Sequence, residues 1–199
     1  MPHSRLLRMR TMPFNKGRIL LPIARSAIAE TLGQSCEASE DATWLQEKAA
    51  CFVTLMQKNK LRGCIGTLEA HRSLLEDVKH NANAAAFHDT RFSPLTNEEL
   101  NITEIEISLL SAIQPLEFLN EQEALEQIQA GTDGILFEFG RYRSTFLPQV
   151  WEQLPATKDF IAHLKNKAGL ASDFWDDEVK LYNYTVSKWK ERDFLAPIE

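Results

Sequence analysis

The residues best suited to chemistry lie in one heptapeptide, Leu61-Arg62-Gly63-Cys64-Ile65-Gly66-Thr67, where a cysteine stands between two glycines and close to an arginine. In an extended segment alternate residues share a face, here Arg62, Cys64 and Gly66 on one side and Leu61, Gly63 and Ile65 on the other. A cation beside a thiol favours the thiolate, which is the nucleophile and metal ligand. Glycines leave room for a close approach to the backbone. The heptapeptide therefore predicts a site.

Cys64 has two interpretations that the sequence leaves open. As a functional residue it is a partly exposed thiol, activated by Arg62, that acts as a nucleophile, a ligand or a site of modification. As a structural residue it is a small side chain where a strand passes under a helix, with glycines required by packing. Arg62 is likewise either an anion-binding residue or the ion-pair partner of Asp89 or of a nearby glutamate.

A second group of polar residues, His88, Asp89 and Arg91, follows the end of a predicted helix. A Cys64–His88–Asp89 triad is disfavoured, because a carboxylate adjacent in sequence rarely orients the imidazole and histidine is common at helix ends. No pair of residues has the spacing of metal ligands, so we expect no metal site. Asp89 and Arg91 either line a binding cleft with the heptapeptide or hold the loop before Pro94.

The hydrophobic pattern predicts an α+β fold. We expect a helix opened by Pro22 and closed by Gly33, an antiparallel hairpin of strands 51–56 and 61–68, and a capping box at Ser73 that opens a helix ending near His88. A half-exposed strand over 102–110, a helix over 121–129 and a hairpin around 140–141 follow. The last part, from Val150, is expected to be mostly helical, with Val179, Tyr182, Val186 and Trp189 at helical spacing. About five strands should form a mainly antiparallel sheet covered by helices.

Composition excludes several classes of protein. The net charge of −6, and the absence of Lys and Arg between Phe92 and Gly140, argue against a nucleic-acid binder. The Arg-rich start is either a transit peptide or, as we favour, a disordered lead over residues 1–16. No segment is suited to cross a membrane. Three cysteines without a disulfide framework indicate the cytoplasm.

The chain resembles the AMMECR-type domain family, whose bacterial and archaeal members are called AmmeMemoRadiSam system protein A. The heptapeptide carries the resemblance most specifically. Four further stretches support the resemblance: Asp89-Thr90-Arg91-Phe92-Ser93-Pro94-Leu95, Ile107-Ser108-Leu109-Leu110-Ser111, Leu147-Pro148-Gln149-Val150, and Lys167-Ala168-Gly169-Leu170 with Trp175. In the first of them, Thr90 stands where the family often has proline. The resemblance spans almost the whole chain and predicts a single AMMECR-type domain over 17–196.

The resemblance implies two subdomains, the larger containing both termini, with a cleft between them. The heptapeptide would face this cleft, and its candidate lining residues are Leu61, Arg62, Gly63, Cys64, Ile65, Gly66, Asp89, Arg91 and Gln149. For Gln149 we favour the alternative, an exposed residue after a strand that Pro148 ends. It also implies association with a Memo-like protein and a radical-SAM enzyme, and it names no cofactor and no reaction. A large substrate, a peptide or a protein, is compatible with such a cleft.

Three functions follow from these observations. The first is an accessory protein whose cleft binds a partner of the Memo-like and radical-SAM system. The second is an enzyme that uses Cys64 as a nucleophile or acceptor. The third is a nucleic-acid-binding regulator, which the acid-rich middle of the chain disfavours.

Overall fold

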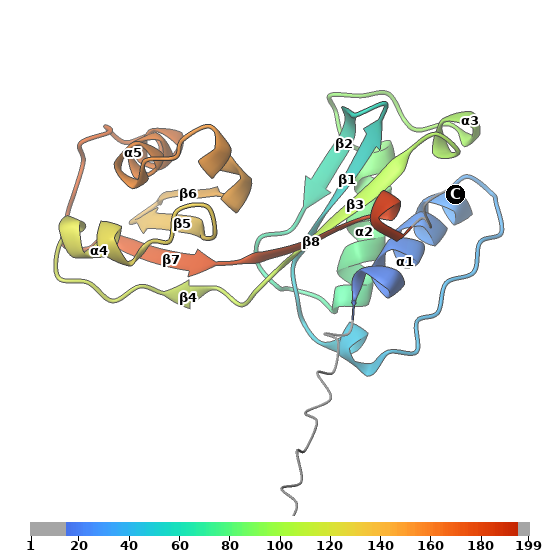
Figure 1. The fold of residues 1–199 in the computed structure, drawn as a ribbon, viewed down its shortest axis with the longest axis horizontal. Coiled ribbons are helices and arrows are strands. Elements are labelled where there is room, and N and C mark those ends of the chain that lie inside the picture. The colour runs from blue at the N-terminus through green and yellow to red at the C-terminus, as the bar shows by residue number, and fades with distance from the viewer. Residues whose placement is uncertain (1–14, 195–199) are drawn as a thin grey trace, which may run out of the picture.

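In the part of the chain that the structure describes, eight strands form two separate antiparallel sheets, one in each of two lobes (Figure 1). The computed structural model describes residues 15–194, so most of the predicted disordered lead, and residues 195–196 of the predicted domain, lie outside the described residues. The prediction of an α+β fold with antiparallel sheets is confirmed, but strands are more numerous than the expected five and are divided between two sheets.

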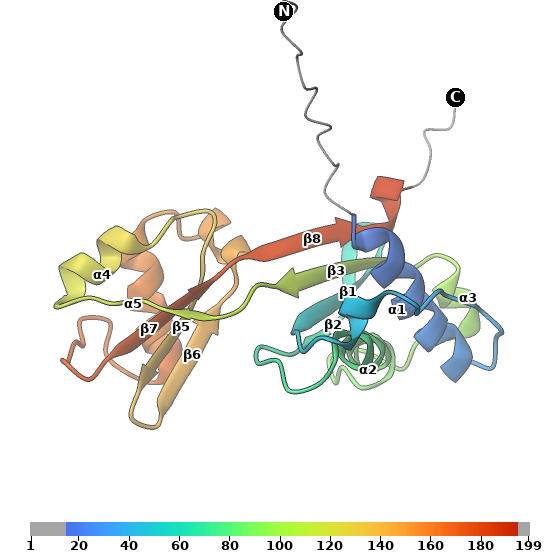
Figure 2. The ribbon, with the colours of Figure 1, turned by 90° about the horizontal axis from the view of Figure 1, so that it is seen from below.

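The first lobe contains a sheet of strand order β2-β1-β3-β8. Its strands are β1 (Cys51–Gln57), β2 (Lys60–Gly66), β3 (Glu104–Leu110) and β8 (Val186–Lys190). Two long helices, α1 (Gly17–Thr31) and α2 (Leu74–Phe87), lie side by side against one face of this sheet (Figure 2). Three shorter elements complete the lobe: η1 (Thr43–Gln46), α3 (Asn97–Leu100) and η3 (Glu191–Phe194).

The second lobe is built on a sheet of order β4-β7-β5-β6. Its strands are β4 (Gln114–Pro115), β5 (Gly134–Phe139), β6 (Tyr142–Phe146) and β7 (Lys180–Tyr184). The helices α4 (Glu121–Gln127), η2 (Pro148–Glu152) and α5 (Thr157–Ala168) belong to the same lobe. A core around Phe137, Trp151 and Phe160, separate from the core of the first lobe, holds these elements together.

The chain crosses between the lobes twice, from β3 to β4 and from β7 to β8 (Figure 1). At the crossing, Ser111 and Thr185 bond each other: the Ser111 N–H donates to the Thr185 carbonyl, and the Thr185 N–H donates to Ser111 Oγ, each over 2.9 Å. A small apolar cluster around Leu110 and Tyr184 fills the junction, and Phe52 packs against it. The first lobe therefore contains both ends of the described chain.

Local signals located most elements correctly. The capping box at Ser73 is present, with the Ser73 hydroxyl accepting from the Glu76 N–H, and α2 ends one residue before His88. The prediction that the helix begins at Pro22 was wrong, because α1 begins at Gly17 and contains Pro22. Pro22 has no N–H, so one backbone hydrogen bond of the helix is missing near its first turn. Among residues 15–194, every helix is too short or too polar to span a bilayer.

The prediction of a mostly helical last part was wrong beyond α5. Val179, Tyr182, Val186 and Trp189 have helical spacing, yet β7 and β8 occupy this region. Pairing decides the outcome: β7 adds to β5, and β8 adds to β3, so backbone bonds to distant strands replace the local bonds of a helix. Trp189 then packs on the helix side of the first sheet, over Gly17.

Candidate functional site

The heptapeptide forms most of β2, an edge strand of the first sheet, and three carboxylates from α2, α3 and the loop between them anchor it. Glu99 on α3 binds Arg62, Asp89 after α2 binds the Cys64 N–H, and Asp77 within α2 accepts from the Thr67 hydroxyl over 2.7 Å. Asp77 is fully buried and also accepts the Cys51 N–H. These bonds fix β2 from end to end.

The two glycines are explained by packing inside the chain. A Cβ at position 63 would lie 2.2 Å from the carbonyl oxygen of Ala85, because the backbone of α2 runs directly against β2 there. A Cβ at position 66 would lie 2.1 Å from the ring of Phe52, which covers Gly66 from the adjacent strand. The close neighbours of both glycines are therefore parts of the protein itself.

Asp89 and Arg91 cover the outer edge of β2 at Cys64. Asp89 Oδ2 accepts the Cys64 N–H over 2.9 Å, and the Arg91 guanidinium donates to the Cys64 carbonyl over 3.2 Å. Arg91 also binds both oxygens of Asp89, at 2.9 and 2.6 Å. The guanidinium beside it, and then the backbone N–H groups, hold the pKa of the Asp89 carboxyl well below its ordinary value. A charged pair thus replaces the next strand that an open edge would recruit.

Arg62 is committed to neighbours in the same way. The pairing of β1 with β2 shifts at Leu55 and Met56 and skips Arg62, which marks a bulge. The guanidinium forms a bidentate pair with Glu99, both N–O distances being 3.1 Å, and donates to the Ser93 carbonyl over 2.8 Å. Arg62 lowers the pKa of Glu99. Of the two interpretations of Arg62, the structure contains the ion pair, formed with Glu99 rather than Asp89.

The side chain of Cys64 points to the face of the first sheet that α1 and α2 do not cover, which we call the open face. Register places a polar row across that face, formed by Cys64, Thr54, Glu106 and Lys190 on the successive strands β2, β1, β3 and β8, with Lys188 beside it. The Thr54 hydroxyl donates to Cys64 Sγ over 3.3 Å. Cys64 and Thr54 are each half-buried on this face.

Glu106 corrects the prediction of a half-exposed strand over 102–110. Only 4% of Glu106 is exposed, although it belongs to the face without helices. Lys188 and Lys190 close over it with N–O distances of 2.6 and 3.3 Å. Both lysines come from β8, which the sequence did not place beside β3. The only sequence signal for this part of the row was the alternation of acidic and apolar residues along β3.

Other predicted residues are not brought to the thiol. His88 is exposed, and the Asp89 oxygens accept from the Cys64 N–H and from Arg91. A Cys64–His88–Asp89 triad is therefore not assembled. Gln149 is exposed on η2 of the second lobe, and Leu61 is exposed at the start of β2, while Ile65 packs on the first core. Leu147, two residues before Gln149, packs in the junction cluster with Phe52.

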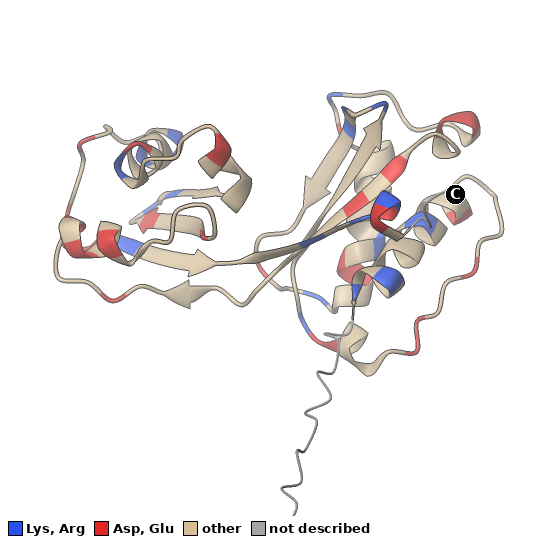
Figure 3. Ribbon diagram, viewed as in Figure 1, with Lys and Arg blue, Asp and Glu red and all other residues tan. Residues whose placement is uncertain are grey.

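Acidic residues are spread over both lobes (Figure 3). Most of those in the stretch without Lys or Arg lie on α3 and β3 of the first lobe and on α4 of the second, and Glu138 lies on β5. Within the described part of the chain, no three His, Cys, Asp or Glu side chains are grouped as a metal site would require.

Fold and site together define a two-lobed α+β protein that presents a thiol on a polar sheet face. The AMMECR1 family model matches residues 21–189. The chain therefore belongs to the AMMECR1 family.

Relatives and a solved structure agree with this assignment. The chain is 34% identical to protein MJ0810 of Methanocaldococcus jannaschii, over 92% of this chain and 94% of that protein. It is also 34% identical to protein PF1979 of Pyrococcus furiosus, over 92% and 91%. The crystal structure of the uncharacterized protein PH0010 from Pyrococcus horikoshii superposes with a TM-score of 0.75, at 34% identity, over 88% of this chain and 91% of that one. The family's biochemical function is uncharacterised.

Proposed function

We propose that this protein is a non-catalytic binding protein that holds a partner polypeptide against its open face. The observation that carries the proposal is the surroundings of Cys64. Its sulfur accepts a bond from Thr54, and among residues 15–194 no imidazole or carboxylate forms a hydrogen bond to it. A nucleophilic cysteine needs such a base or an equivalent activating group. A row that combines a thiol, a hydroxyl and two lysines is suited to recognise a polar segment of another protein.

The partners that we propose are a Memo-like protein and a radical-SAM enzyme, acting with this chain in the cytoplasm. Membership of the family supports the partners, and three unpaired cysteines support the compartment. We further propose that the two lobes form one domain and that a cleft between them admits the partner. Leu147 and Phe52 meet in the junction cluster, next to the strand positions of Gly66 and Cys64. Gln149 would contact the partner from the second lobe.

Binding experiments test this proposal directly. The tagged chain, expressed in its own organism, should retain the Memo-like protein and the radical-SAM enzyme, identified by mass spectrometry. Replacing both Lys188 and Lys190 by alanine should lower the recovery at least tenfold, and Cys64→Ser should lower it as well. Arg141→Ala is the matched control, since Arg141 is an exposed cation on the second lobe. Recovery unchanged by the open-face variants would exclude this face as the interface.

A second candidate function, a thiol-dependent enzyme, is favoured by the hydrogen bond that Thr54 donates to Cys64 Sγ. Such a bond stabilises sulfur as it gains negative charge. Alkylation by iodoacetamide at pH 7 distinguishes the two functions, because Cys36 is a half-buried thiol in the same molecule. An activated Cys64 should react more than tenfold faster than Cys36, whereas an equal or slower rate removes the enzyme hypothesis.

A further inference from the structure

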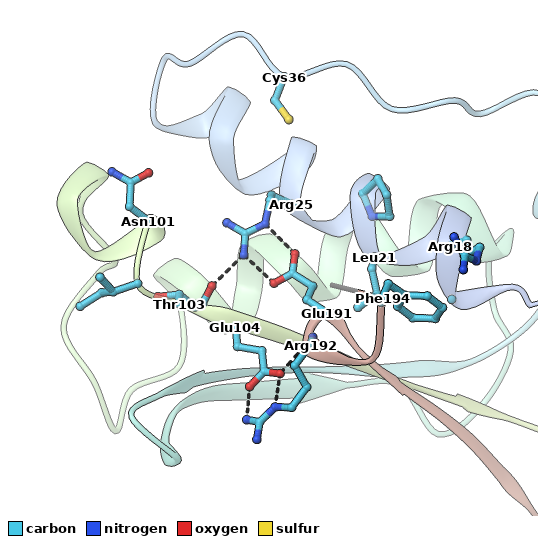
Figure 4. Close-up of a pocket in the computed structure, with 13 residues that line it drawn as sticks. Arg18, Leu21, Arg25, Cys36, Asn101, Thr103, Glu104, Glu191, Arg192 and Phe194 are labelled. Atoms are coloured by element: carbon cyan, nitrogen blue, oxygen red, sulfur yellow. Dashed lines mark hydrogen bonds and ion pairs between the residues drawn. The ribbon is translucent and has the colours of Figure 1, made fainter. Parts of the chain in front are cut away.

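A groove of about 720 Å³ lies in the first lobe, away from the polar row (Figure 4). Its walls are α1, the loop through Cys36, the segment 101–104 after α3, and η3. Four apolar residues line it: Leu21, Pro22, Ile102 and Phe194. The volume falls inside the range of about 300–1,000 Å³ that is typical of small-molecule sites. Neither Cys64 nor Thr54 contributes to it, so this inference is independent of the proposed function.

Most charges of the groove are already neutralised by one another. Arg25 and Glu191 form a bidentate pair in its centre, with both N–O distances 2.6 Å (Figure 4). Arg25 also donates to the carbonyls of Leu100 and Thr103, and Glu191 accepts the Ile105 N–H. This network raises the pKa of Arg25, mainly through Glu191. The pair therefore forms a fixed floor that has no charge left for a ligand.

Arg18 is the exception among the cations of the groove. Arg192 is paired with Glu104, but Arg18 has no carboxylate within ion-pair distance in the described part of the chain. Its guanidinium is exposed and stands 5.2 Å from the centre of the Phe194 ring, at one end of the groove (Figure 4). Stacking on an aromatic ring holds a guanidinium in place while its N–H donors stay available.

Apolar surface is exposed at the other end of the groove, where Figure 4 places Asn101 and Thr103 away from Arg18. Ile102, which lines the groove there, is 59% exposed. An apolar body would remove this surface from water, at about 25 cal/mol per Å². A single negative group at the end of that body would meet Arg18.

We propose that this groove binds a small carboxylic acid, with its aliphatic or aromatic body against Leu21, Pro22, Ile102 and Phe194 and its carboxylate on Arg18. The paired charges of the floor select against a second charge in the middle of the ligand. One anionic end and one apolar end are therefore the defining chemistry of the ligand class.

Fluorescence titration tests the proposal with the full chain. The probe is 8-anilinonaphthalene-1-sulfonate, which has an apolar body and one negative group, and decanoate and decan-1-ol are competitors of equal chain length. Decanoate should displace the probe at a concentration about fivefold lower than decan-1-ol, because only decanoate gains the Arg18 contact. After correction for the salt dependence of the probe's own affinity, salt should raise the inhibition constant of decanoate and leave that of decan-1-ol unchanged.

Variants locate the site. Arg18→Gln should lower the affinity for decanoate about fivefold and leave the affinity for decan-1-ol unchanged. Ile102→Glu should lower the affinity for both competitors. The matched controls lie in the second lobe: Arg141→Gln for the exposed cation, and Leu119→Glu for an aliphatic side chain that is 86% exposed. Since Ile102 is exposed, its variant should fold, and an unchanged circular dichroism spectrum checks this.

Three results would overturn the proposal. Equal displacement by decanoate and decan-1-ol would show that the groove does not recognise a carboxylate. Probe binding that Ile102→Glu leaves unchanged would place the ligand elsewhere. A chain ending at Phe194 that binds the probe more than tenfold more tightly would show that the groove receives the chain's own last residues instead of a ligand.

Discussion

Asp89→Asn tests whether a charged side chain closes the edge of β2. The carboxylate accepts four hydrogen bonds: Oδ2 from the Cys64 N–H and from Arg91, and Oδ1 from the Arg91 N–H and guanidinium. An amide has one oxygen, so either orientation of asparagine leaves two of these donors facing an NH₂ group. The variant keeps the shape of the side chain and removes half of its acceptors.

The expected loss of stability is about 2 kcal/mol. Bonds to a charged group contribute about 1.5–3 kcal/mol each, but Arg91 is half-exposed and recovers part of its loss by turning to water. For a chain of this size, about 2 kcal/mol lowers the melting temperature by roughly 4–8 °C. Urea unfolding, followed by both circular dichroism and tryptophan fluorescence, measures the change and shows whether the lobes unfold together.

The pH dependence supplies an independent check. The pKa of Asp89 is lowered in the folded protein, so its contribution is fully present above the unfolded pKa of about 4 and is lost as the pH falls below it. The difference in stability between wild type and Asp89→Asn should therefore be constant from pH 7 to about 5 and shrink toward pH 3. Asp173→Asn, at an exposed aspartate of the second lobe, is the control. A loss below about 0.5 kcal/mol at pH 7, or a difference that does not change with pH, would refute the edge-closing role of the charge.

Three further variants separate the roles of neighbouring residues. Gly63→Ala should cost about 1–3 kcal/mol, because the Ala85 carbonyl lies where the methyl group would go, while Ser187→Ala on β8 should have little effect in the same urea titration. Glu106→Gln should cost about 1 kcal/mol, and 1 M NaCl should reduce this difference, since Lys188 and Lys190 lose their shared partner. Cys64→Ser should change stability by less than about 0.5 kcal/mol, because the half-buried side chain keeps its bond from Thr54; a larger loss would assign the thiol to the core.

Local sequence signals predicted much of the fold. Both hairpins and the capping box at Ser73 depend on residues within a few positions of each other, and all are present. The strands β7 and β8 were missed because what forms them is pairing with β5 and β3, some 40 and 80 positions earlier in the chain. Their apolar residues have a spacing that equally suits a helix, and pairing overrides it.

The candidate site shows the same division. The heptapeptide was recognisable from its composition, but the partners that hold it are distant in sequence: Asp77, Asp89 and Glu99 anchor it, and Glu106 with the lysines of β8 continues the row from Cys64. No local pattern gives the register that brings these residues together. The bulge at Arg62 is a further example, since it depends on how β2 pairs with β1.

Most residues of the heptapeptide have a structural explanation. Gly63 and Gly66 are required by close packing, and Arg62 and Thr67 are committed to buried or half-buried acidic partners. Even the backbone of Cys64 is bound, by Asp89 and Arg91. The Cys64 sulfur has a single hydrogen bond, from Thr54, and lies on the open face. Because the glycines and the acidic partners hold the backbone of β2 in position around this side chain, the arrangement supports the proposal that Cys64 meets a partner on the open face.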